Sequence, residues 1–104
     1  MHPLLAQRQD ALVDLCRRFG VRRLDAFGSA VRGADFDPTR SDVDFLVELG
    51  GSAGDLAAFL DFKEALEALL GRPVDLVERQ AVEASRNPIR RRRILDEAEP
   101  IYAA

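Results

Sequence analysis

Asp42 and Asp44 stand two residues apart at the start of the most strand-like segment of the chain, residues 42–49. Aspartate is a poor strand former, so its double use here asks for a chemical reason. Side chains at positions i and i+2 of a strand project from the same face, so the two carboxylates are expected side by side. Adjacent carboxylates repel unless a cation lies between them, and Mg²⁺ takes one or two carboxylates together with substrate phosphates and water. The pair is therefore a candidate metal site for phosphoryl chemistry.

A third carboxylate, Asp75, lies in a second short apolar segment, residues 73–78. If that segment forms a strand beside the first, Asp75 joins the same face, and three carboxylates cluster at one end of the sheet. Taken alone, paired aspartates at a strand start are more often solvated than bound to a metal, and a single aspartate is a weaker signal still. Further residues must therefore support the metal site.

Gly28 and Ser29 supply that support, directly after a third strand-like segment, residues 21–27. Glycine permits backbone conformations closed to other residues and lets another group approach closely. If a helix begins behind Ser29, its free N–H groups form a ready site for an anion. We therefore expect this turn to hold the terminal phosphates of a nucleotide while the aspartates hold the metal that bridges them. A Gly-Ser pair by itself is usually an ordinary turn, so the prediction depends on the combination.

The spacing of apolar residues predicts the elements that position these side chains. Besides the three strands, helical periodicity and end signals predict three helices, at 3–19, 52–70 and 88–98. The second helix is expected to begin at a capping box formed by Ser52 and Asp55, and the third at Asn87. A brief helical turn is expected at 30–33. This order favours an α/β layered domain around a small sheet.

Composition bounds the class of protein. A chain of 104 residues, 47% hydrophobic and 32% charged, suits one folded domain, residues 1–104. The net charge of −3 argues against a protein that coats nucleic acid, although the fourteen arginines leave ample capacity to bind phosphate. The single cysteine, Cys16, excludes an internal disulfide and is expected in the core. Because neither a membrane span nor a signal peptide is recognisable, a cytoplasmic protein is expected.

The stretch FGSAVRG followed by SDVDFLVEL resembles the signature of the DNA polymerase β-type nucleotidyltransferase superfamily. Within it, the chain resembles the minimal nucleotidyltransferase (MNT) family, whose members are often the antitoxin half of a HEPN–MNT toxin–antitoxin pair. The resemblance covers almost the whole chain, from the leading helix through PVDLVE to the tail NPIRRRRILDEAEPIY. It implies a polymerase β-like fold, α/β (α+β), with a small mixed sheet flanked by helices.

The resemblance also implies roles for seven residues. The metal ligands and catalytic carboxylates are Asp42, Asp44 and Asp75. Asp75 also serves as the general base for the attacking hydroxyl. The positions around the nucleotide triphosphate are Gly28, Ser29, Arg32 and Ser41. The implied cofactor is Mg²⁺, as two ions, and the implied substrate is ATP. One departure is the loop of twelve residues between Ser29 and Asp42, which is longer than is common in the family.

In the toxin–antitoxin branch, the resemblance implies transfer of AMP from ATP to a tyrosine of a cognate HEPN ribonuclease toxin, which silences the toxin within a hetero-oligomer. Two alternatives stay open: an antitoxin that neutralises by binding alone, and nucleotidyl transfer to RNA or a small molecule. A chain of 104 residues leaves no separate domain to hold an RNA or a drug, which favours a protein acceptor over nucleic acid.

Four consecutive arginines, residues 90–93, open the last predicted helix. Arg92 and Arg93 have acidic residues four positions on, which is the spacing of helix ion pairs. Arg90 and Arg91 have apolar residues there and lie in the first turn, where the helix dipole disfavours cations. A solvated helix face is the usual reason for such a run. The unfavourable placement of Arg90 and Arg91 nevertheless suggests contact with an external anion, either a nucleotide phosphate or the toxin.

Overall fold

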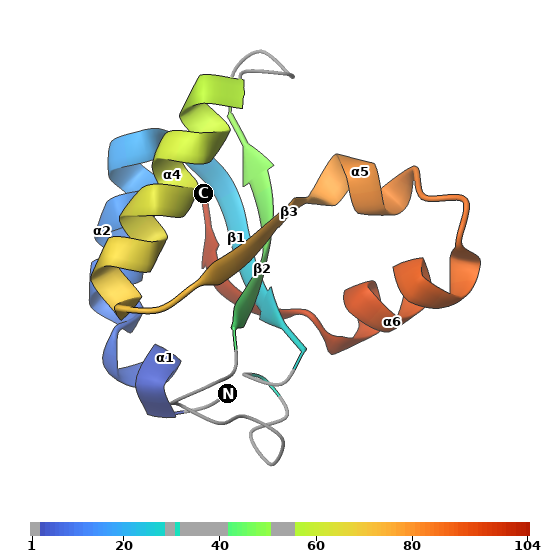
Figure 1. Cartoon of the computed structure of the whole chain (residues 1–104), viewed down its shortest axis with the longest axis horizontal. Helices are drawn as coiled ribbons and strands as arrows, with labels where there is room; N and C mark the ends of the chain where they lie inside the picture. The colour runs from blue at the N-terminus through green and yellow to red at the C-terminus, as the bar shows by residue number, and fades with distance from the viewer. Residues whose placement is uncertain (1–2, 29–30, 32–41, 51–55) are drawn as a thin grey trace.

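A computed structural model of the chain describes residues 3–28, 31, 42–50 and 56–104 and has a four-stranded sheet at its centre (Figure 1). The strands are β1 (Val21–Phe27), β2 (Val43–Leu49), β3 (Val74–Glu78) and β4 (Glu99–Ala103). The helices are α1 (Pro3–Gln7), α2 (Gln9–Phe19), α4 (Leu56–Leu70), α5 (Arg79–Glu83) and α6 (Pro88–Glu97). In the order β3-β2-β1-β4, β1 runs antiparallel to β2 and β4, whereas β2 and β3 are parallel. The predicted mixed sheet flanked by helices is confirmed.

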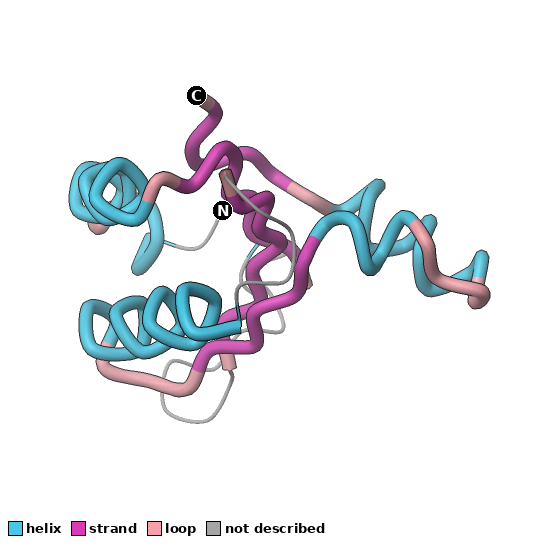
Figure 2. The backbone as a smooth tube through the Cα atoms, turned by 90° about the horizontal axis from the view of Figure 1, so that it is seen from above, coloured by secondary structure: helices cyan, strands magenta, loops and turns pink. Residues whose placement is uncertain are grey.

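One face of the sheet carries the main hydrophobic core. Helices α2 and α4 lie side by side over this face (Figures 1 and 2). The alternation predicted for β2 is confirmed, because Val43, Phe45 and Val47 are fully buried in this core together with Phe62 and Leu66 of α4. The residues between them on β2 therefore point to the opposite face.

On the opposite side of the sheet from α2 and α4 lie α5 and α6, which project away from the sheet (Figure 2). A second, smaller hydrophobic cluster joins Phe27 of β1 and Leu46 of β2 to Val82 of α5 and Ile94 of α6. We call residues 79–97, which comprise these two helices and their connection, the α5–α6 arm. Asp44 precedes Leu46 by two residues on the same face, so the aspartates lie beside the arm rather than in the main core.

The structure differs from the predicted elements in three places. The first helix is interrupted at Arg8, whose N–H donates to the carbonyl of Leu5 at 3.1 Å. Its apolar spacing does not reveal the break, because Leu5 and Leu12, seven residues apart, face the core either way. Residues 79–83, expected as connector, form α5, and residues 99–103, which had no predicted element, form β4. Pro100 argues against a strand at 99–103 in the sequence, because proline cannot donate a backbone hydrogen bond. Proline is nevertheless tolerated at the edge of a sheet, where β4 lies.

Several expectations fall outside the described residues. The expected capping box of Ser52 and Asp55 lies outside them. So does most of the expected helical turn at 30–33, of which only Val31 is described, and Val31 is helical. The cap of the last helix is confirmed, since the Asn87 side chain accepts a hydrogen bond from the Arg90 N–H at 3.1 Å. None of the helices in the described part of the chain is long and apolar enough to cross a bilayer.

A buried ion pair fastens the arm to the sheet. Asp25, in the middle of β1, is fully buried and accepts hydrogen bonds from Arg79 of α5 and from Arg23, the latter at 3.1 Å. Arg79 is itself only 15% exposed, whereas Arg23 is 42% exposed. A carboxylate taken out of water needs such partners, because leaving it unpaired costs several kcal/mol. Asp25 and Arg79 therefore determine how α5 sits on the sheet.

Replacing Arg79 with Met should leave the buried Asp25 carboxylate with only the more exposed Arg23. We expect the free energy of unfolding to fall by about 3 kcal/mol, since breaking a buried pair from one side costs roughly 3–5 kcal/mol. Urea denaturation measures the loss. Arg92→Met is the matched control, because Arg92 is 86% exposed and its surface ion pair contributes at most about 1 kcal/mol. Equal losses in the two variants would contradict the anchoring role.

Cys16 offers a probe of the main core. Its side chain is fully buried, as predicted, and burial raises the pKa of the thiol from 9.0 to about 12. The thiolate is the reactive form, and at pH 8 this shift lowers its fraction about 1000-fold. We expect a disulfide reagent such as DTNB to label the native protein far more slowly than the protein in denaturing urea. The pKa of the Cys16 thiol is higher in the folded protein than in the unfolded protein, so the free energy of unfolding falls as the pH rises from about 9 to 12.

Candidate active site

The sheet register brings two of the predicted carboxylates together. In the parallel pair of β2 and β3, Asp44 lies directly opposite Asp75. Neighbouring strands lie about 4.8 Å apart, and residues in register project from the same face. Asp42 precedes Asp44 by two residues, just before β2 begins. Asp42 and Asp75 are exposed and Asp44 is half-buried, so this end of the sheet presents carboxylates to solvent.

Two hydrogen bonds fix the strand that carries Asp75. The backbone N–H of Val74 donates to the Glu67 carboxylate of α4 at 3.0 Å. The N–H of Val43 donates to the carbonyl of Pro73 at 3.2 Å, which locks the starts of β2 and β3 together. The position of Asp75 is therefore set by both α4 and β2.

Gly28 forms the third side of the site. Phe27 is in register with Asp44, so Gly28 follows directly beside the aspartate. Its φ is +73°, and a Cβ at this position would lie 2.5 Å from Oδ2 of Asp44. Both properties expected of this glycine, a conformation that side chains disfavour and close approach of another group, are confirmed. The carbonyl of Gly28 also accepts a hydrogen bond from the N–H of Val31 at 3.1 Å.

The expected cluster of three carboxylates is not preformed. Across residues 3–28, 31, 42–50 and 56–104, no group of three Asp, Glu, His or Cys side chains is placed to hold a metal ion. Like charges on Asp42, Asp44 and Asp75 favour separated side chains when no cation lies between them. The donor set still fits Mg²⁺, because hard carboxylate oxygens on one solvent-accessible sheet face are ligands that this ion prefers. Ser29, Arg32 and Ser41 lie outside the described residues.

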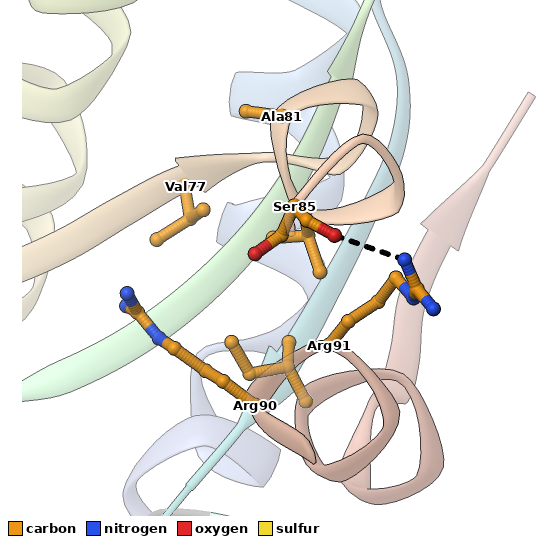
Figure 3. A pocket seen from close by; sticks show the side chains of 7 residues that line it. Val77, Ala81, Ser85, Arg90 and Arg91 are labelled. Atoms are coloured by element: carbon orange, nitrogen blue, oxygen red, sulfur yellow. Dashed lines mark hydrogen bonds between the residues drawn. The ribbon is translucent and has the colours of Figure 1, made fainter. Parts of the chain in front are cut away.

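The two remaining candidates, Arg90 and Arg91, line a pocket in the α5–α6 arm. Its volume is about 150 Å³, and its other lining residues are Val77, Ala81, Val82, Ser85 and Ile94. Figure 3 shows the two arginines leaving α6 on opposite sides of this pocket, Arg90 on the side of Val77 and Arg91 on the side of Ser85. Arg91 donates to the Ser85 carbonyl at 2.9 Å. Arg90 has no side-chain partner among the described residues.

The comparison with known proteins decides the family. The family of nucleotidyltransferase domains matches residues 10–101, which contain Gly28 and all three aspartates. The chain belongs to this family. Because the match covers nearly all of the chain, the edge of the sheet that carries the carboxylates lies within the nucleotidyltransferase domain and not in an appended segment.

Relatives of this nucleotidyltransferase are minimal members of the family. This chain is 44% identical to the protein adenylyltransferase MntA of Thermococcus cleftensis, over 68% of this chain and 69% of MntA. A solved structure described as a minimal nucleotidyltransferase is 36% identical, with 96% of each chain covered and a TM-score of 0.73. The resemblance to minimal nucleotidyltransferases, inferred from the motifs, is thereby confirmed.

Toxin–antitoxin complexes share the fold. One complex with AMP-PNP matches with a TM-score of 0.67 at 17% identity, over 92% of this chain and 73% of that one. A complex of tri-AMPylated Shewanella oneidensis HEPN toxin with MNT antitoxin matches with a TM-score of 0.63 at 15% identity, over 95% and 72% of the two chains. At these identities the likeness shows a common fold.

Replacing Gly28 with Ala tests the contact with Asp44. Gly71→Ala is a matched control, because Gly71 has φ +67° and nothing within 4 Å of its would-be Cβ. Both variants should lose about 1–2 kcal/mol of stability from the left-handed conformation. Only Gly28→Ala displaces the Asp44 carboxylate, so only this variant should bind Mn²⁺ with an ATP analogue at least tenfold more weakly, roughly 1.4 kcal/mol. Equal Mn²⁺ affinities, measured by electron paramagnetic resonance, would show that Asp44 does not need the glycine.

Proposed function

We propose that this nucleotidyltransferase is a Mg²⁺-dependent antitoxin that transfers AMP from ATP to a tyrosine of a cognate HEPN ribonuclease toxin and thereby neutralises it. The observation that carries the proposal is the register of Asp44 and Asp75 beside the Gly28 turn. A positive-φ glycine next to paired carboxylates suits a triphosphate and the metal that binds it. The Thermococcus relative named protein adenylyltransferase and the fold shared with an MNT antitoxin bound to AMPylated HEPN toxin support the choice of AMP and of the acceptor.

The residues divide between binding and chemistry. Gly28 and Ser29 hold the β- and γ-phosphates, with Arg32 and Ser41 as further contacts of the triphosphate. Asp42 and Asp44 are the ligands for the metal, and Asp75 is the third. Mg²⁺, as two ions, would neutralise the charge that develops on the phosphate oxygens.

Asp75 also acts as the general base. It lies on the far side of Asp44 from Gly28, where an acceptor hydroxyl can approach. In the proposed step, the tyrosine oxygen forms a bond to the α-phosphorus while its proton passes to the Asp75 carboxylate. The bond between the α-phosphorus and the oxygen bridging to the β-phosphorus breaks, and pyrophosphate leaves with that electron pair. The products are AMP-tyrosine and pyrophosphate.

A protein acceptor suits the described fold better than RNA or a small molecule. The described residues form one sheet with two helical layers, and none of them makes a separate domain for a polynucleotide. A hetero-oligomer in which the toxin supplies the acceptor side of the site is therefore the expected assembly. Because ATP is the donor, we expect the reaction to take place in the cytoplasm.

The double variant Asp42→Asn, Asp44→Asn should fold but transfer no AMP, because amides neither bind Mg²⁺ well nor carry the charge that attracts it. The test incubates each protein with ATP, Mg²⁺ and the purified toxin and determines the toxin mass by intact mass spectrometry. The wild type should add one or more AMP units. Asp61→Asn is the control, because Asp61 is an exposed carboxylate on α4, on the other side of the sheet.

Two results would contradict the proposal in different ways. Undiminished AMP transfer by the double variant would refute the metal role of Asp42 and Asp44. A toxin that gains no mass from the wild type, while a stable complex still forms, would mean that this protein neutralises by binding alone.

A further inference from the structure

The α5–α6 arm is basic in an acidic protein. Its residues, 79–97, carry six arginines and three acidic residues, a net charge of +3. The whole chain has a net charge of −3, so the remaining residues carry −6. An acidic partner is therefore attracted to the arm and repelled by the rest of the molecule, which restricts how it can approach.

Most arginines of the arm already have partners. Arg79 pairs with the buried Asp25, and Arg91 donates to the Ser85 carbonyl. The Nε of Arg92 lies 3.7 Å from Oδ2 of Asp96, and the Nε of Arg93 lies 3.6 Å from Oε1 of Glu97. These are the helix ion pairs expected from the spacing of the residues. The guanidinium of Arg90 has no such partner in the part of the chain that the structure describes, although the pocket lies at its side.

The position of Arg90 is unfavourable for the free protein. With Asn87 as N-cap, Arg90 is the third residue of α6, where the helix dipole disfavours a cation and where glutamate would complete a capping box. A residue that weakens its own helix and has no local partner is best explained by a ligand that the helix meets.

The pocket beside Arg90 is placed on the acceptor side of the site. Val77, which lines the pocket, follows Asp75 by two residues on the same face of β3, about 7 Å along the strand. Across the sheet, Gly28 at the end of β1, Asp44 of β2 and Asp75 of β3 lie in that order. In an in-line displacement the attacking and leaving oxygens lie on opposite sides of the phosphorus. If pyrophosphate leaves on the Gly28 side, the acceptor arrives on the side of β3 and of this pocket.

We propose that the pocket of the α5–α6 arm docks an acidic segment of the acceptor protein, with an apolar side chain against Val77 and Ile94 and a carboxylate on Arg90. The inference rests on the proposed function for the identity of the acceptor, but it concerns binding and not transfer. The apolar walls exclude water from the contact, which strengthens an ion pair at the rim. Docking here would bring a neighbouring tyrosine of the acceptor to Asp75.

Charge reversal at Arg90 tests the docking site. Arg90→Glu should not unfold α6, since glutamate suits this position of the helix. Titration calorimetry with the purified HEPN toxin should show at least a tenfold loss of affinity for Arg90→Glu and at most a threefold loss for Arg90→Lys. Arg92→Glu carries the same charge change on the same helix outside the pocket lining, and it should lose at most threefold. Binding of a non-hydrolysable ATP analogue to the chain alone should be unchanged in all three variants.

Three outcomes would overturn the inference. Unchanged toxin affinity in Arg90→Glu would remove the contact. An equal loss of toxin affinity in Arg92→Glu would mean that the effect of Arg90→Glu is a general effect of charge. Weaker binding of the ATP analogue in Arg90→Glu, with toxin affinity retained, would mean that the pocket binds the nucleotide and not the toxin. Because affinity is measured without transfer, the docking inference can hold even if no AMP is transferred, and it can fail while transfer proceeds.

Discussion

The parallel pairing of β2 with β3 is the constraint on which the site depends. Successive residues of a strand face opposite sides, so a slip of one residue would turn Asp75 toward α2 and α4 and move Val74 and Leu76 out of the main core. The apolar residues of β3 therefore enforce the register that sets Asp75 opposite Asp44. The geometry of the candidate site and the packing of the main core are therefore specified by the same alternation. Helix α4, which connects the two strands, adds a further restraint through Glu67 and the N–H of Val74.

The second face of the sheet combines two environments that are usually separate. At one end it presents solvent-accessible carboxylates, and further along it is closed by Phe27, Leu46, Val82 and Ile94. The ion pair of Asp25 and Arg79 lies between β1 and α5 and keeps the arm on this face although the apolar cluster beneath it is small. A larger apolar cluster would hold the arm as well, but a directional ion pair also fixes its orientation.

Local sequence patterns predicted several geometric features of the fold and of the candidate site, because these features are local. The alternation of β2, the positive φ of Gly28 and the cap at Asn87 each depend on a few neighbouring residues. By contrast, β4 forms only because β1 offers an edge to residues far away in the chain, and its proline conceals it. The ion pair of Asp25 and Arg79 joins residues 54 apart, so only a charged residue within an apolar strand hinted at it. Among the described residues no three such side chains are placed to hold a metal ion, and no spacing pattern expresses the mutual repulsion of carboxylates that a cation must offset.

The pairing of β1 with β4 also bears on how the molecule folds. Arg23 is in register with Ala103, eighty residues further along the chain. Closing so long a loop loses entropy before any contact is gained, so domains rich in such pairings fold slowly. On a ribosome, the last strand of the sheet cannot pair with β1 until nearly all of these residues have been synthesised. Until then β1 keeps one edge open, which makes the unfinished chain a potential template for aggregation and a substrate for chaperones.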